Sequence, residues 1–255
     1  MRLNLIGISG KTGSGKDTVG KIIQYLTDKN AKEMSFKDWY ASNVYSVYQV
    51  MGKYKIQKFA TKLKQIASLL TGIPIEKFED QEFKKTFLGE QWRVYKNLNT
   101  GKQGIENIRS EHSAETYLMA VREFLQKLGT EAMRDVIHPN VWVNALFADY
   151  KHTKKFYNEE GEQLRMKGLP DWIITDMRFP NELQAIKERN GIVIRVNRDL
   201  IIGENDYGYT KVSINKAEKD GIINPQHSSE TALDNAEFDY TITNDGSIED
   251  LITTV

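Results

Sequence analysis

A glycine-rich stretch near the start of the chain, Gly10 to Thr18, has the residue types and the spacing that suit phosphate binding. Glycines allow the backbone to turn tightly, so that successive N–H groups point at one anion. Lys16 adds a full positive charge that can follow a transferring phosphate. Asp17 takes the position directly after the lysine, where the common motif has a Ser or Thr that holds Mg2+. The stretch therefore predicts a phosphate-binding loop, or P-loop, that departs from the strict pattern by one residue.

The segments on either side of this loop are those that a P-loop requires. Residues 3–8 form a compact apolar run that predicts a buried strand, and residues 18–28 carry apolar side chains at helical spacing. The N-terminus of such a helix adds unpaired N–H groups and a partial positive charge. Since strand, loop and helix agree, the alternative of a chance glycine-rich turn is disfavoured.

The rest of the chain alternates between predicted strands and predicted helices. Further strands are expected at 56–60, 172–176, 191–196 and 240–243. Helices are expected at 40–51, 63–72, 113–128, 141–150, 182–189, 228–233 and 247–253, with Gly129 interrupting the helix that Ser113 opens. This alternation predicts an α/β fold with a parallel sheet and helices on both faces.

Three polar, poorly periodic stretches interrupt this alternation. They lie near residues 75–115, 151–170 and 199–226. Long stretches of this kind inside a compact domain are usually functional or disordered. We therefore predict a single domain over residues 1–255 with these three insertions, of which 151–170 forms a surface hairpin or loop. We also expect 199–226 to close over bound ligands and exclude water.

The composition limits the classes of partner. The 35 basic and 35 acidic residues give a formal net charge of zero, which argues against a nucleic-acid-coating role. The absence of cysteine excludes disulfides and zinc–sulfur sites, and the four histidines are widely separated. No apolar run approaches the roughly 20 residues of a membrane helix. We expect a cytoplasmic protein with neither a nucleic-acid nor a membrane partner, and a homodimer stays open.

Five blocks of sequence, in order, resemble the phage-type deoxynucleoside monophosphate kinases, which are P-loop kinases. The blocks are 10–18, 59–64, 125–131 with 140–143, 175–182, and 227–230 with 239–246. They span nearly the whole chain, and 89–113 and 151–170 match least well. The resemblance implies transfer of the γ-phosphoryl group of ATP to a deoxynucleoside 5′-monophosphate, with ATP and Mg2+ as cofactors, on a P-loop NTPase-type parallel sheet.

The resemblance also implies roles for residues at the donor side of such a reaction. Asp176 ends a predicted strand, where open α/β sheets bind ligands, and Arg178 follows it. Lys16, Asp17 and Arg178 are expected to be catalytic, and Thr18 and Asp176 to hold the metal. The expected cofactor-binding residues are Gly13, Ser14, Gly15, Lys16, Asp17, Thr18, Arg198 and Asn244.

Each of the acidic and basic candidates has a structural alternative. Asp176 could be the N-cap of the next helix, and Arg178 could form a surface ion pair. Asp17 could simply suit the N-terminus of a helix, where a negative charge is favourable.

A monophosphate acceptor needs further cations and a surface for its base. The expected substrate-binding residues are Lys64, Arg122, Gln126, Arg134, Trp142 and Asp176. The alternatives are a solvated lysine at 64, a plain surface face for Arg122 with Gln126, an Arg134–Asp135 salt bridge, and a core tryptophan at 142. His227 and Glu230 lie in a family block, and a structural role is favoured for both.

Two other functions stay open at this point. One is another small-molecule P-loop kinase, such as dephospho-coenzyme A kinase, whose C-terminal pattern is similar. The other is a nucleotide-dependent switch or ATPase module that binds a partner protein. A switch would hydrolyse nucleotide slowly without an acceptor, whereas a kinase would release little ADP until a deoxynucleoside monophosphate is added.

Overall fold

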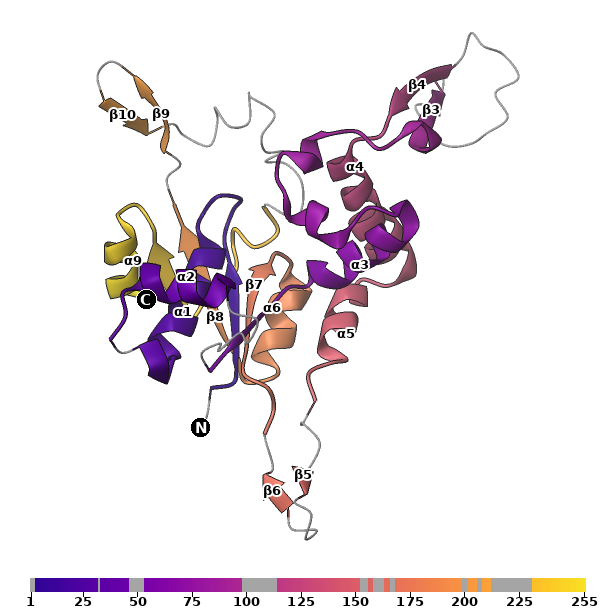
Figure 1. The fold of residues 1–255 in the computed structure, drawn as a ribbon. Helices are drawn as coiled ribbons and strands as arrows, with labels where there is room; N and C mark the ends of the chain where they lie inside the picture. Colours follow the sequence, from indigo (N-terminus) through magenta and orange to yellow (C-terminus); the bar gives the residue numbers. More distant parts are fainter. Residues whose placement is uncertain are drawn as a thin grey trace. The chain divides into compact units, whose positions relative to one another are not determined.

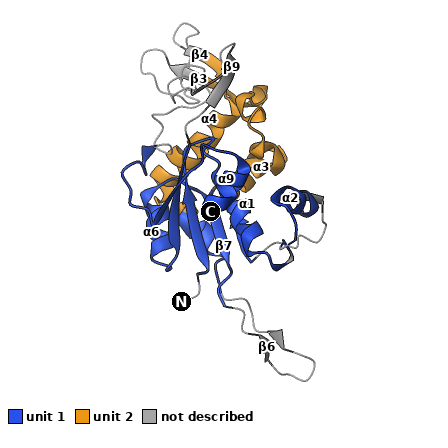
Figure 2. Cartoon of the chain, turned by 90° about the vertical axis from the view of Figure 1, so that its left-hand side faces the viewer, with its two compact units in different colours: residues 1–59, 143–255 blue, residues 60–142 orange. Residues whose placement is uncertain are grey.

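The chain divides into two compact units (Figure 2), made of residues 1–59 with 143–255 and of residues 60–142. The computed structural model describes residues 3–31, 33–45, 53–97, 114–151, 156–157, 163–165, 168–198, 201–205, 208–211 and 231–255. The organisation as one domain with three insertions stays a prediction.

The first unit is built on a five-stranded sheet in the order β11-β8-β1-β7-β2 (Figure 1). Every neighbouring pair of strands is parallel. The strands are β1 (Leu5–Ser9), β2 (Lys55–Gln57), β7 (Trp172–Met177), β8 (Ile192–Asn197) and β11 (Tyr240–Thr243). The predicted parallel sheet is confirmed, and β1, which leads into the P-loop, is its central strand.

Helices cover both faces of this sheet, as predicted (Figure 2). They are α1 (Lys16–Thr27) and α9 (Ile248–Thr254) on one face and α6 (Pro180–Lys187) on the other. Val19 and Ile22 of α1 share one apolar core with Ile6 and Ile8 of β1. A central parallel strand is buried on both faces, which explains its uninterrupted apolar sequence.

Gly7 in the middle of β1 is explained by the close approach of α6. A Cβ atom at Gly7 would lie 2.5 Å from Ile186 Cδ1, closer than real contacts allow. We expect Gly7→Ala to lower the free energy of unfolding by about 1–3 kcal/mol, because overpacking a core displaces its neighbours. Urea unfolding measures this change. Gly168→Ala is the control, since a Cβ at Gly168 meets nothing within 4 Å; an equal loss in both variants would contradict the packing argument.

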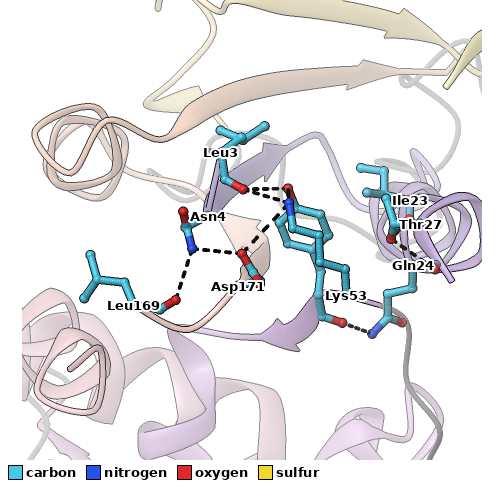
Figure 3. Close-up of polar contacts among 9 residues, drawn as sticks. Leu3, Asn4, Ile23, Gln24, Thr27, Lys53, Leu169 and Asp171 are labelled. Atoms are coloured by element: carbon cyan, nitrogen blue, oxygen red, sulfur yellow. Dashed lines mark hydrogen bonds and ion pairs between the residues drawn. The ribbon is translucent and has the colours of Figure 1, made fainter. Parts of the chain in front are cut away.

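Polar contacts join the starts of three strands at the opposite end of the sheet from the P-loop (Figure 3). Asn4 Nδ2 donates a hydrogen bond to Asp171 Oδ1 at 2.9 Å. Lys53 Nζ and Tyr54 Oη donate to the carbonyl oxygen of Leu3 at 3.0 and 2.9 Å. These contacts tie together the amino ends of β1, β2 and β7, so polar residues there serve the fold.

The second unit is mainly helical. Its core contains Ala67, Phe78, Leu88, Val121 and Phe124. Its longer elements are α3 (Ala60–Thr71), α4 (Val121–Gln126), a π-helix (Lys127–Ile137) and the start of α5 (Val141–Phe147). The short 3-10 helices η2 (Ile75–Glu79), η3 (Phe83–Lys85) and η4 (Glu90–Trp92) and the antiparallel strands β3 (Arg93–Asn97) and β4 (Ala114–Leu118) complete it.

Two predictions in this unit are wrong. The helix predicted from residue 113 onward does not include residues 114–118, because these form β4 and pair with β3; the helix begins at Val121. Pairing with a distant segment overrides local helical spacing in such a case. Gly129 does not interrupt the helix either, since helical backbone continues to Ile137. A Cβ at Gly129 would lie 2.9 Å from Leu63 Cδ2, so this glycine permits close packing of α3.

The polar stretches at 151–170 and 199–226 each contain a short antiparallel pair of strands, of which only the first was predicted. The hairpin within 151–170 is confirmed by the antiparallel pair β5 (Phe156–Tyr157) and β6 (Gln163–Arg165). A second antiparallel pair is β9 (Ile201–Asn205) with β10 (Gly208–Lys211). Near the start, η1 is Lys29–Ala31 and α2 is Phe36–Tyr45.

Several predictions fall outside the described residues. They are residues 98–113 of the insertion predicted near 75–115, the last part of the helix at 40–51, most of the closing segment at 199–226, His227 with Glu230, and the start of the helix at 228–233. Among the described helices, none is long and apolar enough to cross a membrane.

Candidate active site

The glycines of the P-loop occupy positions where other residues would not fit. Gly13 and Gly15 have φ angles of 82° and 89°, in the left-handed region that favours glycine. A Cβ atom at Gly10 would lie 2.3 Å from Ser14 Oγ. One at Gly15 would lie 2.3 Å from Asn244 Nδ2. The loop is therefore a tightly folded backbone that only this glycine pattern allows.

Positive and donor groups converge on this loop. α1 begins at Lys16, and no side chain caps the helix at Gly15. Its first N–H groups therefore suit an anion. Lys16 Nζ reaches back to the carbonyl oxygen of Lys11 at 3.5 Å. The hydroxyl of Ser14 is buried and, among the described residues, has no hydrogen-bond partner. A phosphate group fits this set of donors.

Asp17, in the first turn of α1, is held by two other elements. Thr175 Oγ1 of β7 donates a hydrogen bond to Asp17 Oδ1 at 2.6 Å, and Lys58 Nζ lies 3.2 Å from the same oxygen. Burial raises the pKa of Asp17, but the Thr175 hydrogen bond and the charges of Lys58 and Lys16 outweigh it, so the pKa lies below its usual 3.8. The stability that this carboxylate contributes is thus present above pH 3.8 and is lost as the pH falls through the lowered pKa.

Asp176 joins the end of β7 to Phe59, two residues after β2. Its Oδ1 accepts a hydrogen bond from the backbone N–H of Phe59 at 2.8 Å. It is not the N-cap of the next helix, because that position belongs to Phe179; the N-cap alternative is wrong. Since β7 pairs in parallel with both β1 and β2, Asp176 shares their carboxyl edge with the P-loop.

Arg178 lies in a turn whose backbone a buried carboxylate holds in place. Glu182, with 2% of its surface exposed, accepts backbone N–H hydrogen bonds from Arg178 at 2.7 Å and from Phe179 at 3.1 Å. α6 then begins at Pro180, a residue that suits the first helical position. The half-buried Arg178 is therefore presented by a rigid turn two residues beyond Asp176.

The two later candidates for cofactor binding lie after strands of the same sheet. Asn244, which follows β11, is buried, and its Nδ2 donates to the carbonyl oxygen of Ser14 at 2.9 Å. It therefore supports the P-loop directly. Arg198, which follows β8, is exposed.

Two substrate candidates in the second unit are buried. Lys64 has 8% of its surface exposed and forms an ion pair with Glu79, so the alternative of a solvated lysine is wrong. Trp142 has 4% exposed, and its Nε1 donates to the carbonyl oxygen of Gly129 at 2.8 Å. This contact supports the interpretation of Trp142 as a core residue.

The other candidates in that unit are more accessible. Arg122 and Gln126 lie one turn apart on α4, and Arg122 Nη2 donates to Gln81 Oε1 at 3.3 Å. Arg134 Nη1 lies 3.5 Å from the carbonyl oxygen of Pro139. Their roles toward an acceptor stay predictions.

Comparison with known proteins assigns the family. A family model described as "Deoxynucleotide monophosphate kinase" matches residues 4–255. The chain belongs to this family. It is also similar to a protein of Escherichia phage T5 named deoxynucleoside-5′-monophosphate kinase, with 26% identity over 246 residues, which cover 90% of this chain and 84% of that protein. The chain is thus a deoxynucleoside monophosphate kinase, and neither of the two alternative functions is favoured.

Three residues of this kinase that contact the site were not among the predicted site residues. Thr175 was expected only as part of a family block, and Lys58 was expected inside the strand at 56–60. Glu182 was predicted as the start of a helix, but its buried position beneath the turn was not. Because β2 ends at Gln57, three residues before the predicted end of the strand, Lys58 lies at the edge where parallel strands bind ligands.

A fourth missed residue of the kinase, Arg195, connects the start of the P-loop to a later segment. Its Nη1 donates to Ser9 Oγ at 3.2 Å, and its Nη2 lies 3.0 Å from Asp234 Oδ1. The other carboxylate oxygen of Asp234 lies 3.4 Å from Lys11 Nζ in the loop. A charged residue inside the apolar strand β8 was the available signal.

Proposed function

We propose that this kinase transfers the γ-phosphoryl group of ATP to deoxynucleoside 5′-monophosphates, with Mg2+, to give the diphosphates. The observation that carries the proposal is the common edge of the sheet. The P-loop, Asp17 and Asp176 all lie at the carboxyl ends of the neighbouring parallel strands β1 and β7. This edge is where open α/β sheets bind ligands.

The P-loop would hold the phosphates of the donor. Phosphoryl transfer asks a protein mainly for positioning and for stabilisation of charge. The backbone N–H groups of residues 13–18 and the hydroxyl of Ser14 would cradle the phosphate oxygens, and Lys16 would follow the transferring group. Asn244 would act through Ser14, by keeping the loop in its folded form. Arg198 would lie toward the adenine.

The hydroxyl of Thr18 and the carboxylate of Asp176 would hold Mg2+, Asp176 through water. Hydroxyl and carboxylate oxygens are the ligands that this hard cation prefers, and one or two carboxylates with substrate phosphates are its usual set. The cation would neutralise charge on the phosphates. Asp17, which is ionised at neutral pH, would assist the cation or orient the acceptor phosphate.

The acceptor phosphate would be bound by cations outside the P-loop. Arg178 would contact the transferring phosphate with its planar guanidinium, which can make two parallel hydrogen bonds. Lys64, Arg122 and Arg134 are proposed for the acceptor phosphate, and Gln126 for the edge of its base. Base stacking by Trp142 is the least supported of these roles, because its ring is buried.

A coupled assay of ADP release across all deoxynucleoside and nucleoside monophosphates tests the proposed function. ADP release that depends on a deoxynucleoside monophosphate supports it. Release at the same rate without any acceptor would instead identify an ATPase or switch. The same assay is run with dephospho-coenzyme A as the acceptor. ADP release with this acceptor and with none of the monophosphates would identify a dephospho-coenzyme A kinase.

We predict that phosphoryl transfer requires Mg2+ or a similar hard cation. Excess EDTA should abolish ADP release, and added Mg2+ should restore it, because the donor phosphates need a cation to neutralise their charge. The unfolding temperature, followed by circular dichroism with and without EDTA, is the control for loss of structure. Undiminished turnover in EDTA would contradict the prediction.

A further inference from the structure

The hydroxyl of Thr175 is buried and bonded to the carboxylate of Asp17. Thr175, in β7, has 0% of its surface exposed, and its Oγ1 lies 2.6 Å from Asp17 Oδ1. The side chain of Asp17 is 51% exposed. A fixed donor from the sheet thus holds one oxygen of a carboxylate that otherwise reaches solvent. Neither this hydrogen bond nor the Lys58 contact involves Oδ2.

Gly20 permits the approach of α1 that makes this contact short. It lies one turn after Asp17, and a Cβ atom there would be 2.7 Å from Thr175 Cγ2. A glycine in the middle of a helix is otherwise unfavourable relative to alanine. The methyl group of Thr175 therefore packs against the bare backbone of Gly20, while the hydroxyl group on the same carbon faces Asp17.

Lys58 contacts the same oxygen but constrains it differently. Its ammonium group lies 3.2 Å from Asp17 Oδ1. A lysine is a point charge on a flexible four-carbon stem, so it supplies charge without fixing a direction. The short side chain of Thr175 stands on a buried strand and has little freedom. Of the two contacts, the threonine is the one that can select a rotamer of Asp17.

We propose that Thr175 is a positioning residue of the kinase, which holds the Asp17 carboxylate in one rotamer beside the P-loop. This inference rests on the role proposed above for Asp17 at the phosphate groups. A misplaced catalytic group costs rate because reacting groups must be held in the right geometry before the reaction. Thr175 acts through Asp17 and does not need to touch substrate.

The first test measures the rotamer of Asp17 in the ligand-free kinase. Three-bond scalar couplings report χ1 by NMR. We expect one rotamer in the wild type and in Thr175→Ser, and an average of several in Thr175→Val, which keeps the shape but loses the donor. Thr241→Val, at an exposed position of β11, is the control and should leave Asp17 unchanged. An unchanged Asp17 rotamer in Thr175→Val would overturn the proposal.

A second variant keeps the test open if Thr175→Val fails to fold. Gly20→Ala retains the Thr175 hydroxyl but forces its methyl group away from α1. It should also give averaged Asp17 couplings, and a single rotamer in this variant would count against the proposal.

The second test uses kinetics and a double-mutant cycle. Thr175→Val should lose roughly 10-fold in kcat with little change in KM, as is typical when an orienting partner is removed, and Thr175→Ser should recover most of the rate. In an Asp17→Asn background, Thr175→Val should cause no further loss, because both changes remove one function. A further full loss in that background, or failure of Thr175→Ser to recover the rate, would overturn the proposal.

If the wild type phosphorylates no deoxynucleoside monophosphate, the proposed function fails. The NMR couplings of Asp17 still test whether Thr175 positions its carboxylate.

Discussion

Lys16→Ala is expected to lower kcat by roughly 10²–10³-fold or more while the protein stays folded, on the scale seen when one preorganised stabilising group is removed. Lys16 begins α1 at the P-loop, and its ammonium group lies over the loop at the Lys11 carbonyl oxygen rather than in an apolar core. The fold should therefore tolerate its loss, whereas the charge on the transferring phosphate would lose its main protein counter-charge.

Steady-state ADP release measures this effect, and circular dichroism checks the fold. Lys21→Ala is a matched control on the same helix, because Lys21 points to Tyr40 Oη, at 2.7 Å, and has no proposed part in the site. Lys21→Ala should retain the wild-type rate. Near-normal turnover by folded Lys16→Ala would refute the proposed role of the P-loop.

Arg178→Lys is expected to lose roughly 10²-fold or more in kcat and to leave KM nearly unchanged. An arginine that bridges phosphate oxygens makes two parallel hydrogen bonds, which a lysine cannot reproduce. Because Glu182 holds the backbone N–H groups of Arg178 and Phe179, the turn itself should survive the substitution. The loss should therefore arise from the transition state and not from a displaced backbone.

Kinetics with both substrates varied distinguish the outcomes for Arg178. A large rise in KM for the deoxynucleoside monophosphate with kcat unchanged would move Arg178 into acceptor binding. No effect on either constant would leave it as a surface residue. Arg93→Lys is the control for an arginine-to-lysine substitution as such. Arg93 forms an exposed ion pair with Glu90, and such pairs contribute little to stability, so this variant should keep the wild-type kcat and KM.

The sequence alone was sufficient for the parts of the site whose residues are consecutive. The glycines, Lys16 and the start of α1 lie within nine residues of chain, so the shape and charge of the P-loop follow from local backbone preferences. The strand predicted at 172–176 and the helix predicted at 182–189 likewise match β7 and α6 to within two residues at each end, because an apolar run and helical spacing mark them. The parallel sheet followed from the alternation of such elements.

Local patterns failed where a distant segment decided the conformation. Residues 114–118 were predicted as the start of a helix, yet they pair as a strand with residues 93–97. Gly129 is the kind of residue that often ends a helix, yet it lies inside helical backbone, where the missing Cβ leaves room for Leu63. The residues adjacent in sequence to 114–118 and to Gly129 contain no signal for these contacts with distant segments.

The contacts that complete the site were decided by the tertiary structure for the same reason. Thr175 lies 158 residues from Asp17, and Asn244 lies 230 residues from Ser14, and each pair forms a hydrogen bond. Strand order determines which strand ends are neighbours, and this order results from packing of the whole sheet rather than from any one strand. The sequence therefore determined the backbone of the glycine-rich loop that is predicted to bind phosphate, whereas the order of strands β11, β8, β1, β7 and β2 decided which side chains support that loop.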